Sequence, residues 1–292
     1  MEIVMNAGRY EARENGVVLA RAATKSAAKY HGRKKLEVMP AAKVQEFGIN
    51  KRFDFVDKLV SMVATKKAKS VIISGPGGLG KTYSVMEALT KSGLRDISAI
   101  DSLTLGSKID LSKCFRFIKG YSTAKGLYRT LYESRNMTLV FDDCDSVLKD
   151  PVALNLLKSA LDSFSKRYIS WNAETRGDSD LPQSFEFKGQ IVFITNVDLA
   201  KLDQAVKTRS MCIDLAMSQD DKLERMDNIV QSDKFLPDVR RDVKDNALTF
   251  LKSKAAVVQD LNLRSLIQIT NIANSGDKDW KDLAKYVISQ GQ

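Results

Sequence analysis

The sequence predicts a three-layer α/β core domain followed by a small all-α domain, and three observations carry this prediction. Short apolar runs rich in Val, Ile and Phe alternate with helical segments, the pattern of buried parallel strands joined by crossover helices. After Met217 the strand signals stop and only helical periodicity follows. A length of 292 residues, with 43% apolar and 28% charged residues, suits one globular core domain with one or two small ones.

These patterns divide the chain into residues 1–50, 51–217 and 218–292. In the first segment, Asn15-Gly16 between short alternating runs indicates a hairpin and the Ala-rich basic stretch after it indicates a helix, so we expect a small basic appendage. In the second, strands are predicted at Ser70–Gly75, Cys114–Ile118, Thr138–Asp142, Ile191–Thr195 and Met211–Ala216. In the third, helices that start at favourable N-cap residues are predicted at Ser218–Gln231, Asp238–Ser253, Asn262–Ala273 and Asp277–Ile288.

Composition narrows the classes of function. Lys and Arg number 46 against 36 Asp and Glu, a net charge of +10 that favours polyanionic partners. With one His and three Cys lacking CxxC spacing, a His- or Cys-ligated metal site and a Ser-His-Asp triad are not expected. No apolar run approaches the roughly 20 residues of a membrane helix, and the charged N-terminus does not match a signal peptide. We therefore expect a cytoplasmic protein without a membrane partner.

The segment GPGGLGKT follows the first predicted core strand and opens a helix, which is the context of a phosphate-binding loop. Its glycines let backbone N–H groups surround a polyphosphate, and the helix N-terminus adds partial positive charge. Lys81 is expected to reach the β- and γ-phosphates, and the Thr82 hydroxyl to ligate Mg²⁺. The residues predicted to bind ATP here are Gly75, Pro76, Gly77, Gly78, Leu79, Gly80, Lys81, Thr82 and Tyr83.

Three carboxylates, Asp142, Asp143 and Asp145, directly follow the apolar run TLVF. Mg²⁺ that arrives with a nucleoside triphosphate prefers oxygen ligands and retains several waters. Asp142 ends a strand expected beside the phosphate-loop strand, so we predict that it holds Mg²⁺ together with Thr82. Asp143 is predicted to face the attacking water. The alternative interpretation of this cluster is a solvated acidic turn.

Taken in order, GPGGLGKT, LVFDDCD, VFITN, AVKTRS and NLRSL resemble the AAA+ ATPases, a family of ring-forming molecular motors and switches. The resemblance extends from about residue 50 to residue 273, and the region around FEFKGQIVFITN is most similar to bacteriophage-encoded members. It implies a parallel α/β core with a helical lid, ATP and Mg²⁺ as ligands, and hydrolysis between subunits of a homo-oligomeric ring, with a hexamer as the expected form. For a phage-encoded protein, the compartment is the host cytoplasm.

Three site residues receive their roles from this resemblance alone. Asn196 matches the polar residue that helps to orient the hydrolytic water. Arg209 matches the arginine finger, which reaches the γ-phosphate bound to the neighbouring subunit, and Arg264 matches the lid arginine that contacts the nucleotide of its own chain. The family usually has Glu where this chain has Asp143, and the shorter side chain makes slow hydrolysis one expectation.

The sequence leaves the macromolecular substrate open. In the loop Ile118–Gly126, Tyr121 suits a grip on unfolded polypeptide, stacking on a nucleic-acid base, or packing into the core. The basic clusters Gly32–Lys35 and Lys66–Lys69 suit either phosphate contacts or solvated helix faces. The long connection Tyr168–Gln190 is of a kind that is more often functional or mobile than structural. The favoured function is a DNA-associated ATPase that moves or remodels a macromolecule; a protein-remodelling ATPase and a slowly hydrolysing nucleotide-gated scaffold are the alternatives.

Overall fold

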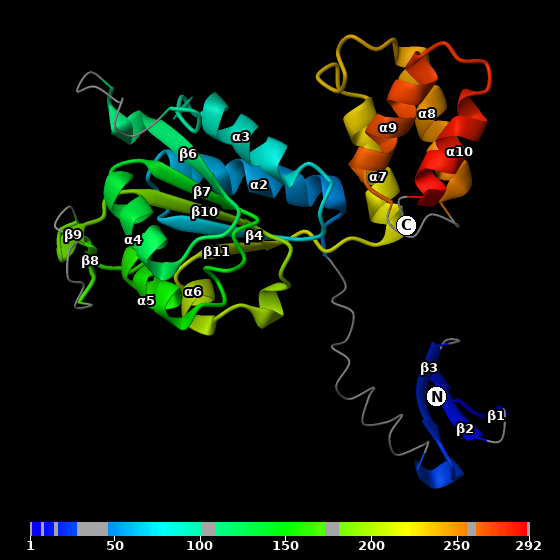
Figure 1. Cartoon of the computed structure of the whole chain (residues 1–292), viewed down its shortest axis with the longest axis horizontal. Coiled ribbons are helices and arrows are strands. Elements are labelled where there is room, and N and C mark those ends of the chain that lie inside the picture. Colours follow the sequence, from blue (N-terminus) through cyan, green and yellow to red (C-terminus); the bar gives the residue numbers. More distant parts are fainter. Residues whose placement is uncertain are drawn as a thin grey trace. The chain divides into compact units, whose positions relative to one another are not determined.

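In a computed structural model, the chain divides into two units, Met1–Glu46 and Phe47–Gln292 (Figure 1). The structure describes residues 2–6, 9–14, 17–27, 46–100, 109–172, 181–255 and 261–290. The basic cluster Gly32–Lys35 lies outside these residues.

The first unit contains a three-stranded antiparallel sheet in the order β1-β2-β3. Its strands are β1 (Glu2–Asn6), β2 (Arg9–Glu14) and β3 (Val17–Ala22). β2 and β3 pair on either side of Asn15-Gly16, where the sequence indicates a hairpin. The buried Glu11 carboxylate accepts hydrogen bonds from Nε of Arg13 at 3.0 Å and Nε of Arg21 at 2.7 Å, so this small sheet holds an ion-paired carboxylate.

The second unit is built on a six-stranded sheet, in the order β11-β4-β10-β7-β6-β5, in which all neighbouring strands run parallel. Its strands are β4 (Ser70–Ser74), β5 (Arg95–Asp96), β6 (Cys114–Lys119), β7 (Thr138–Asp142), β10 (Gln190–Thr195) and β11 (Met211–Asp214). Every residue of β4, β7 and β10 is buried, which explains their continuous apolar runs. The five predicted strands are confirmed, and the two-residue edge strand β5 is additional.

One prediction about this sheet is wrong. The strand that ends in Asp142 was expected beside the phosphate-loop strand, but β10 lies between β7 and β4. In register, Ile194 of β10 pairs with Asp142 on one side and with Ile73 of β4 on the other. The apolar runs of the sheet are alike, so strand order depends on long-range packing that local pattern does not report.

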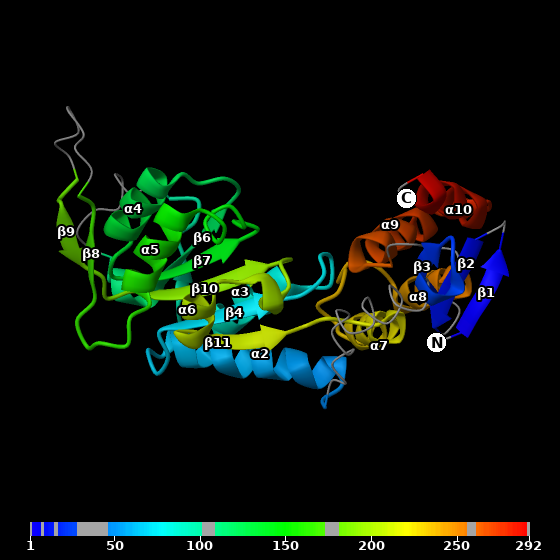
Figure 2. The ribbon, with the colours of Figure 1, turned by 90° about the horizontal axis from the view of Figure 1, so that it is seen from below.

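Helices cover both faces of this sheet, which makes the predicted three layers (Figures 1 and 2). On one face lie α2 (Ile49–Ala64) and α3 (Lys81–Lys91), and on the other α4 (Ala124–Glu133), α5 (Pro151–Ala160) and α6 (Gln204–Thr208). Side chains alternate along β7: Val140 packs with the α2 and α3 layer, whereas Leu139 and Phe141 pack with the α4 and α5 layer. The sheet is therefore buried from both sides.

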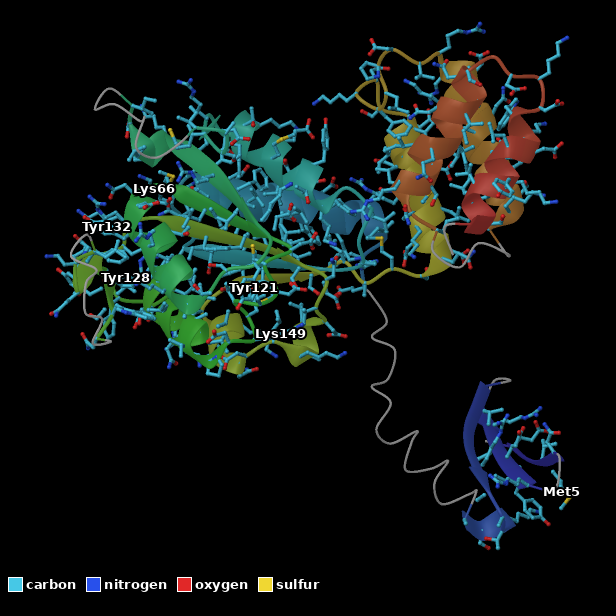
Figure 3. All side chains as sticks on the ribbon, in the orientation of Figure 1. Met5, Lys66, Tyr121, Tyr128, Tyr132 and Lys149 are labelled. Atoms are coloured by element: carbon cyan, nitrogen blue, oxygen red, sulfur yellow. The ribbon has the colours of Figure 1, made fainter. Side chains whose placement is uncertain are left out.

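The described part of the long connection before β10 is anchored to the core. It forms a two-stranded antiparallel sheet of β8 (Tyr168–Ser170) and β9 (Ser184–Glu186), and residues 173–180 lie outside the described residues. The hydroxyl of Tyr128 donates to the Pro182 carbonyl at 2.5 Å, and the rings of Tyr128 and Tyr132 pack against Phe185. Figure 3 shows both tyrosines on the side of α4 that faces β8 and β9.

A bundle of four helices follows β11, so the predicted all-α domain is confirmed for the described residues. These are α7 (Gln219–Val230), α8 (Arg241–Lys254), α9 (Leu263–Asn274) and α10 (Trp280–Gln290). Ser218 and Asp221 form a capping box at α7, and Asn262 caps α9. Asp238 is not a cap: Val239 N–H donates to the Leu236 carbonyl, and α8 starts later, with Arg240 at the N-cap. No helix among the described residues is long and apolar enough to cross a membrane.

Candidate nucleotide-binding site

The glycine-rich loop of residues 75–80 leaves the carboxyl end of β4 and leads into α3. Gly78 and Gly80 have left-handed backbone, with φ values of +74° and +90°, which side-chain-bearing residues rarely adopt. Gly75 is required by space, because a Cβ there would lie 2.8 Å from Cβ of Leu215. The strand–loop–helix geometry of a phosphate-binding loop is therefore present, with the N-terminus of α3 available for an anion.

Lys81, the first residue of α3, is nearly buried, with 6% of its surface exposed. Its Nζ donates to the carbonyls of Gly75 and Pro76, both at 2.7 Å, and to Oδ1 of Asn196 at 2.9 Å. Burial lowers the pKa of the Lys81 ammonium below its usual value, while the nearby carboxylates, Asp143 foremost, oppose this change. Because little water solvates this ammonium, a phosphate bound beside it would interact with it more strongly than with an exposed lysine.

Thr82 of α3 and Asp142 of β7 lie together although β10 separates β7 from β4, the strand that leads into the phosphate loop. Oγ1 of Thr82 is 3.1 Å from both carboxylate oxygens of Asp142, and Asp142 is only 5% exposed. Nζ of Lys119 lies 3.4 Å from Oδ2 of the same carboxylate, so a cation already sits at this position. A hydroxyl and a carboxylate suit Mg²⁺, which takes oxygen ligands and completes its shell with waters and phosphate oxygens. The residues present therefore fit the metal.

Asp143 and Asn196 are joined to the phosphate loop by a chain of hydrogen bonds. Nδ2 of Asn196 donates to Oδ1 of Asp143 at 2.9 Å, while Oδ1 of Asn196 accepts from Lys81. Asp143 has φ of +55°, a left-handed conformation that Asp tolerates better than most residues. Strained backbone of this kind clusters at functional sites. Next to it, Asp145 accepts a hydrogen bond from Thr195 Oγ1 at 2.6 Å, which ties the end of β10 to the acidic turn.

The helical bundle contacts the phosphate loop directly. Leu79 is fully buried, and it packs in the core of the bundle rather than in the core of the sheet. The amide of Leu263, at the start of α9, donates to the Gly78 carbonyl at 2.7 Å. A Cβ on Gly78 would lie 3.0 Å from Cβ of Asn262. The bundle therefore packs against the loop as the expected lid, and Leu79, which the sequence predicts to bind ATP, instead anchors the loop to that lid.

A pocket of about 360 Å³ brings most of the predicted residues together. Its lining includes Gly77, Gly78, Gly80, Lys81, Thr82, Tyr83, Asp142, Asp143, Asn196 and Arg264. Arg264 reaches it from α9 and lies close enough to lower the pKa of Lys81 further. Among the other predicted residues, Gly75 and Pro76 hold Lys81 through their carbonyls, and Leu79 is turned into the lid.

A second pocket of about 500 Å³ adjoins the first and was not predicted from the sequence. The two share Gly80, Tyr83, Leu263 and Ile267. The second pocket extends between α3 and α7, where Ile229 and Phe235 supply apolar surface. Its residues come from distant segments of mainly ordinary amphipathic helices, so no local motif marks them.

Polar contacts in this second pocket centre on Arg225 of α7. Its guanidinium stacks 3.7 Å from the ring centroid of Phe53 and donates to Oδ1 of Asn50 and of Asn228. Burial lowers the pKa of Arg225 to about 10. Across the pocket, Lys234 pairs with Glu87 of α3. The pocket thus has an apolar interior with a few fixed polar groups, as small-molecule sites usually do.

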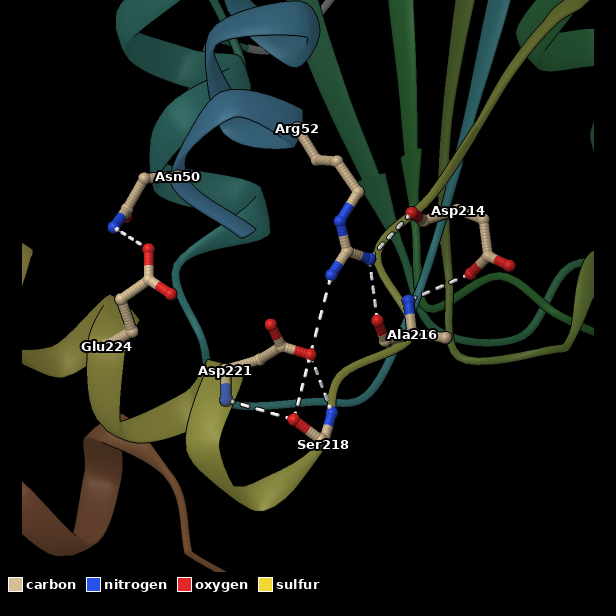
Figure 4. Close-up of polar contacts among 7 residues, drawn as sticks. All are labelled: Asn50, Arg52, Asp214, Ala216, Ser218, Asp221 and Glu224. Carbon is tan, nitrogen blue, oxygen red and sulfur yellow. Dashed lines mark hydrogen bonds and ion pairs between the residues drawn. The ribbon is translucent and has the colours of Figure 1, made fainter. Parts of the chain in front are cut away.

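Arg52 joins α2, the end of β11 and the lid (Figure 4). Its Nη1 donates to the carbonyls of Asp214 at 3.2 Å and Ala216 at 2.6 Å, and its Nη2 lies 3.6 Å from the Asp221 carboxylate. Asn50 adds a hydrogen bond to Glu224 at 3.0 Å. This cluster holds the segment through which the chain passes from the sheet into α7.

Arg209 lies near the amino-terminal end of β4, whereas the phosphate loop follows the carboxyl end of the same strand. Its carbonyl accepts a hydrogen bond from Oγ of Ser70, the first residue of β4, whereas the phosphate loop follows the last residue of β4. At roughly 3.3 Å per residue, the length of β4 separates them by about 16 Å. The Arg209 side chain is exposed and its Nη1 donates to the Ala205 carbonyl at 3.1 Å. The structure describes all three predicted catalytic residues, Asp143, Asn196 and Arg209. Of these three, only Arg209 lies away from the pocket.

The sequence has a relative among curated proteins. The chain is 30% identical over 279 residues to the "Uncharacterized 36.7 kDa protein in nrdC-mobD intergenic region" of Enterobacteria phage T4, which covers 89% of this chain and 80% of that protein. No protein-family model matches the sequence.

Several solved structures are similar to this chain at low identity. NtrX from Brucella abortus in complex with ADP is 14% identical with a TM-score of 0.45, and the match covers 87% of this chain but only 56% of the NtrX chain. The FIGL-1 AAA domain in complex with ADP is 15% identical with a TM-score of 0.42, over 84% of this chain and 77% of that one. PCH-2 of C. elegans is 13% identical with a TM-score of 0.44, over 83% and 68%.

The parallel sheet, the phosphate loop at the end of β4 and the helical lid that packs on that loop form the α/β core with a helical lid that the resemblance to the AAA+ ATPases implies. The chain belongs to the same family as the phage T4 protein, which agrees with its resemblance to bacteriophage-encoded proteins.

Proposed function

We propose that this protein binds ATP with Mg²⁺ between the phosphate loop and the lid, and hydrolyses it. The observation that carries the proposal is the convergence of Lys81, Thr82, Asp142, Asp143 and Arg264 on one pocket, from segments far apart in the chain. Two cationic side chains suit the triphosphate, and the hydroxyl–carboxylate pair suits its metal.

The adjoining apolar pocket is proposed to take the nucleoside. It continues from the phosphate pocket through Gly80 and Tyr83, and its volume of about 500 Å³ suits a ligand of that size. Because its walls belong to both α3 and the lid, the nucleotide would bridge core and lid, and its binding would stabilise their packing.

The residues around the pocket support water attack on the γ-phosphate. Asp143 would accept a proton from the attacking water and orient it, and Asn196 holds Asp143 in place through its 2.9 Å hydrogen bond. Thr82 and Asp142 would hold Mg²⁺, which neutralises charge on the phosphates. Lys81 and Arg264 would bind phosphate oxygens and so position the reacting group.

The exposed Arg209 supports a site completed by a second chain. An arginine about 16 Å from the phosphate loop of its own chain cannot contact a phosphate bound there. We therefore propose a homo-oligomeric ring, with a hexamer as the expected form, in which Arg209 reaches the γ-phosphate of the adjacent subunit.

Lys81→Ala tests nucleotide binding. The substitution removes the only phosphate-loop ammonium, and the loss of charge-assisted hydrogen bonds worth about 3 kcal/mol should weaken ATP binding about 100-fold. The measurement is ATP affinity by calorimetry, with thermal unfolding to show that the protein stays folded. Lys58→Ala, at an exposed position on α2, is the control and should bind as the parent does. An unchanged affinity in Lys81→Ala would refute the site.

DNA is the favoured macromolecular substrate of the proposed ATPase. The net charge of +10 favours a polyanion. Tyr121 is 82% exposed on the loop after β6, so packing into the core is excluded, and the ring is free to stack on a base (Figure 3). Lys69, from the second basic cluster, instead donates to the carbonyls of Asp162 and Phe164, both at 2.7 Å, and is not a free phosphate contact.

Salt dependence of binding tests this choice. If Arg33, Lys34 and Lys35 contact duplex DNA, their replacement by Ala should reduce the slope of log affinity against log salt by about 0.9 for each phosphate that is no longer neutralised. Replacing Lys278, Lys281 and Lys285 by Ala removes the same charge elsewhere and should change the slope less. If the parent binds no DNA at low salt, with or without ATP, the DNA proposal fails.

Protein remodelling is the second candidate, and the same exposed Tyr121 favours it. An exposed aromatic residue beside Gly120 also suits a grip on extended polypeptide. ATP-dependent unfolding of a tagged protein that is lost in Tyr121→Ala would select this function. Binding of ATP with very slow turnover and no effect of either substrate would instead select a nucleotide-gated scaffold.

A further inference from the structure

The contact between Lys119 and Asp142 links the metal position to an exposed loop. Lys119 is the last residue of β6 and the register partner of Asp142 on β7. Its Nζ lies 3.4 Å from Oδ2 of Asp142, and Oγ1 of Thr82 lies 3.1 Å from both oxygens of the same carboxylate. The ammonium thus contacts the carboxylate that, together with Thr82, fits Mg²⁺.

We propose that Lys119 is a positioning residue that competes with Mg²⁺ for the Asp142 carboxylate, so that metal arriving with the nucleotide releases Lys119 and the loop that follows it. This inference rests on the proposed ATP and Mg²⁺ site. It adds a way for that site to control the exposed Tyr121.

Competition follows from charge and burial. The Asp142 side chain is 7% exposed, so only a small part of it is open to further ligands, and two cations at one carboxylate repel each other strongly where water is excluded. The Lys119 side chain is 64% exposed, so its ammonium can move into water at little cost. It also lies 5.5 Å from the ring centroid of Phe117, a contact that needs no carboxylate. Lys119 is therefore the cation that leaves.

The loop beyond Lys119 is short and held at both ends. At its far end, the Thr123 side chain caps α4 by accepting from the Gly126 amide at 3.1 Å. At its near end, Lys119 is followed by Gly120, which has a left-handed φ of +85°, and by the exposed Tyr121. The backbone of Lys119 stays in β6, so loss of the ion pair removes only the side-chain restraint at the near end, and Tyr121 two residues later is expected to change position when metal binds.

A binding titration tests the competition without any turnover. MgCl₂ is added to the full chain with a non-hydrolysable fluorescent ATP analogue, and the half-saturating Mg²⁺ concentration is measured. Lys119→Ala should lower this concentration about fivefold, the upper range for a half-exposed ion pair, and leave analogue affinity in EDTA unchanged. Lys119→Arg should restore the parental value. Lys113→Ala is the matched control, because it removes an exposed lysine side chain at the position just before β6.

A probe on the loop tests its release. Tyr121→Cys carries an environment-sensitive dye on a Cys212→Ser background, since Cys212 is exposed while Cys114 and Cys144 are buried. With analogue bound, MgCl₂ should change the dye signal in this protein. With Lys119→Ala added, the signal should already have its metal-bound value before MgCl₂ and should not change further.

The outcomes separate this inference from the function on which it rests. If the analogue binds the parent but Lys119→Ala matches Lys113→Ala in its Mg²⁺ requirement, or the dye responds to MgCl₂ equally with and without Lys119, the competition is refuted and the nucleotide site stands. If the parent binds no analogue with or without Mg²⁺, the proposed function fails, and this inference fails with it.

Discussion

Asp143→Asn is expected to bind ATP as tightly as the parent and to lose turnover by about 10²-fold or more, the contribution of a positioned general base. The substitution keeps the shape of the side chain, and an amide oxygen still accepts the hydrogen bond from Asn196. Asn also tolerates the left-handed backbone at this position, where φ is +55°. Only the negative charge that activates water is lost, so the protein should accumulate in its ATP-bound state.

Steady-state ATPase rate and ATP affinity, measured on the same preparation, check this result. Asp145→Asn is the matched control, because it makes the same change two residues away. Asp145 is not among the residues that line the pocket. It accepts a hydrogen bond from Thr195, and the amide oxygen of Asn can accept the same bond. Its turnover should stay within a few-fold of the parent. Turnover of Asp143→Asn at the parental rate would remove Asp143 from the reaction.

Arg209→Ala should reduce ATP turnover about 10³-fold while each chain still folds and binds ATP, because an arginine finger contributes on this scale. Arg209 is exposed and lies at the edge of the sheet away from its own phosphate loop. Mixing Arg209→Ala chains with Lys81→Ala chains should restore part of the activity. At equal amounts, about one interface in four of a head-to-tail ring would pair an intact phosphate loop with an intact finger.

The measurement is ATPase rate across mixing ratios, with mass by light scattering to verify mixed oligomers. Arg240→Ala, at another exposed arginine, is the control and should retain parental turnover. ATP should also stabilise the oligomer, by the same coupling free energy through which assembly tightens ATP binding. No recovery in verified mixed oligomers would contradict action between chains, and full activity of Arg209→Ala alone would remove Arg209 from the site.

Local sequence was sufficient for the fold class, the strands and the phosphate loop. The apolar runs at Thr138–Asp142 and Ile191–Thr195 are continuous because both faces of these strands are buried, and that burial is legible in the residues themselves. The glycines and Lys81 of GPGGLGKT are legible for a similar reason, since left-handed turns and phosphate contacts restrict which residues fit at fixed spacing. Such constraints act within a few residues of one another.

Relations between distant segments required the tertiary structure. The insertion of β10 between β4 and β7, which places Asn196 between Lys81 and Asp143, depends on how similar apolar strands sort within one sheet. The burial of Leu79 in the lid depends on surfaces more than a hundred residues apart. The Lys119–Asp142 contact depends on strand register. Periodicity predicts that a side chain is buried or paired. Which residue it contacts depends on the packing of the whole unit, because distant segments contact each other only in the folded chain.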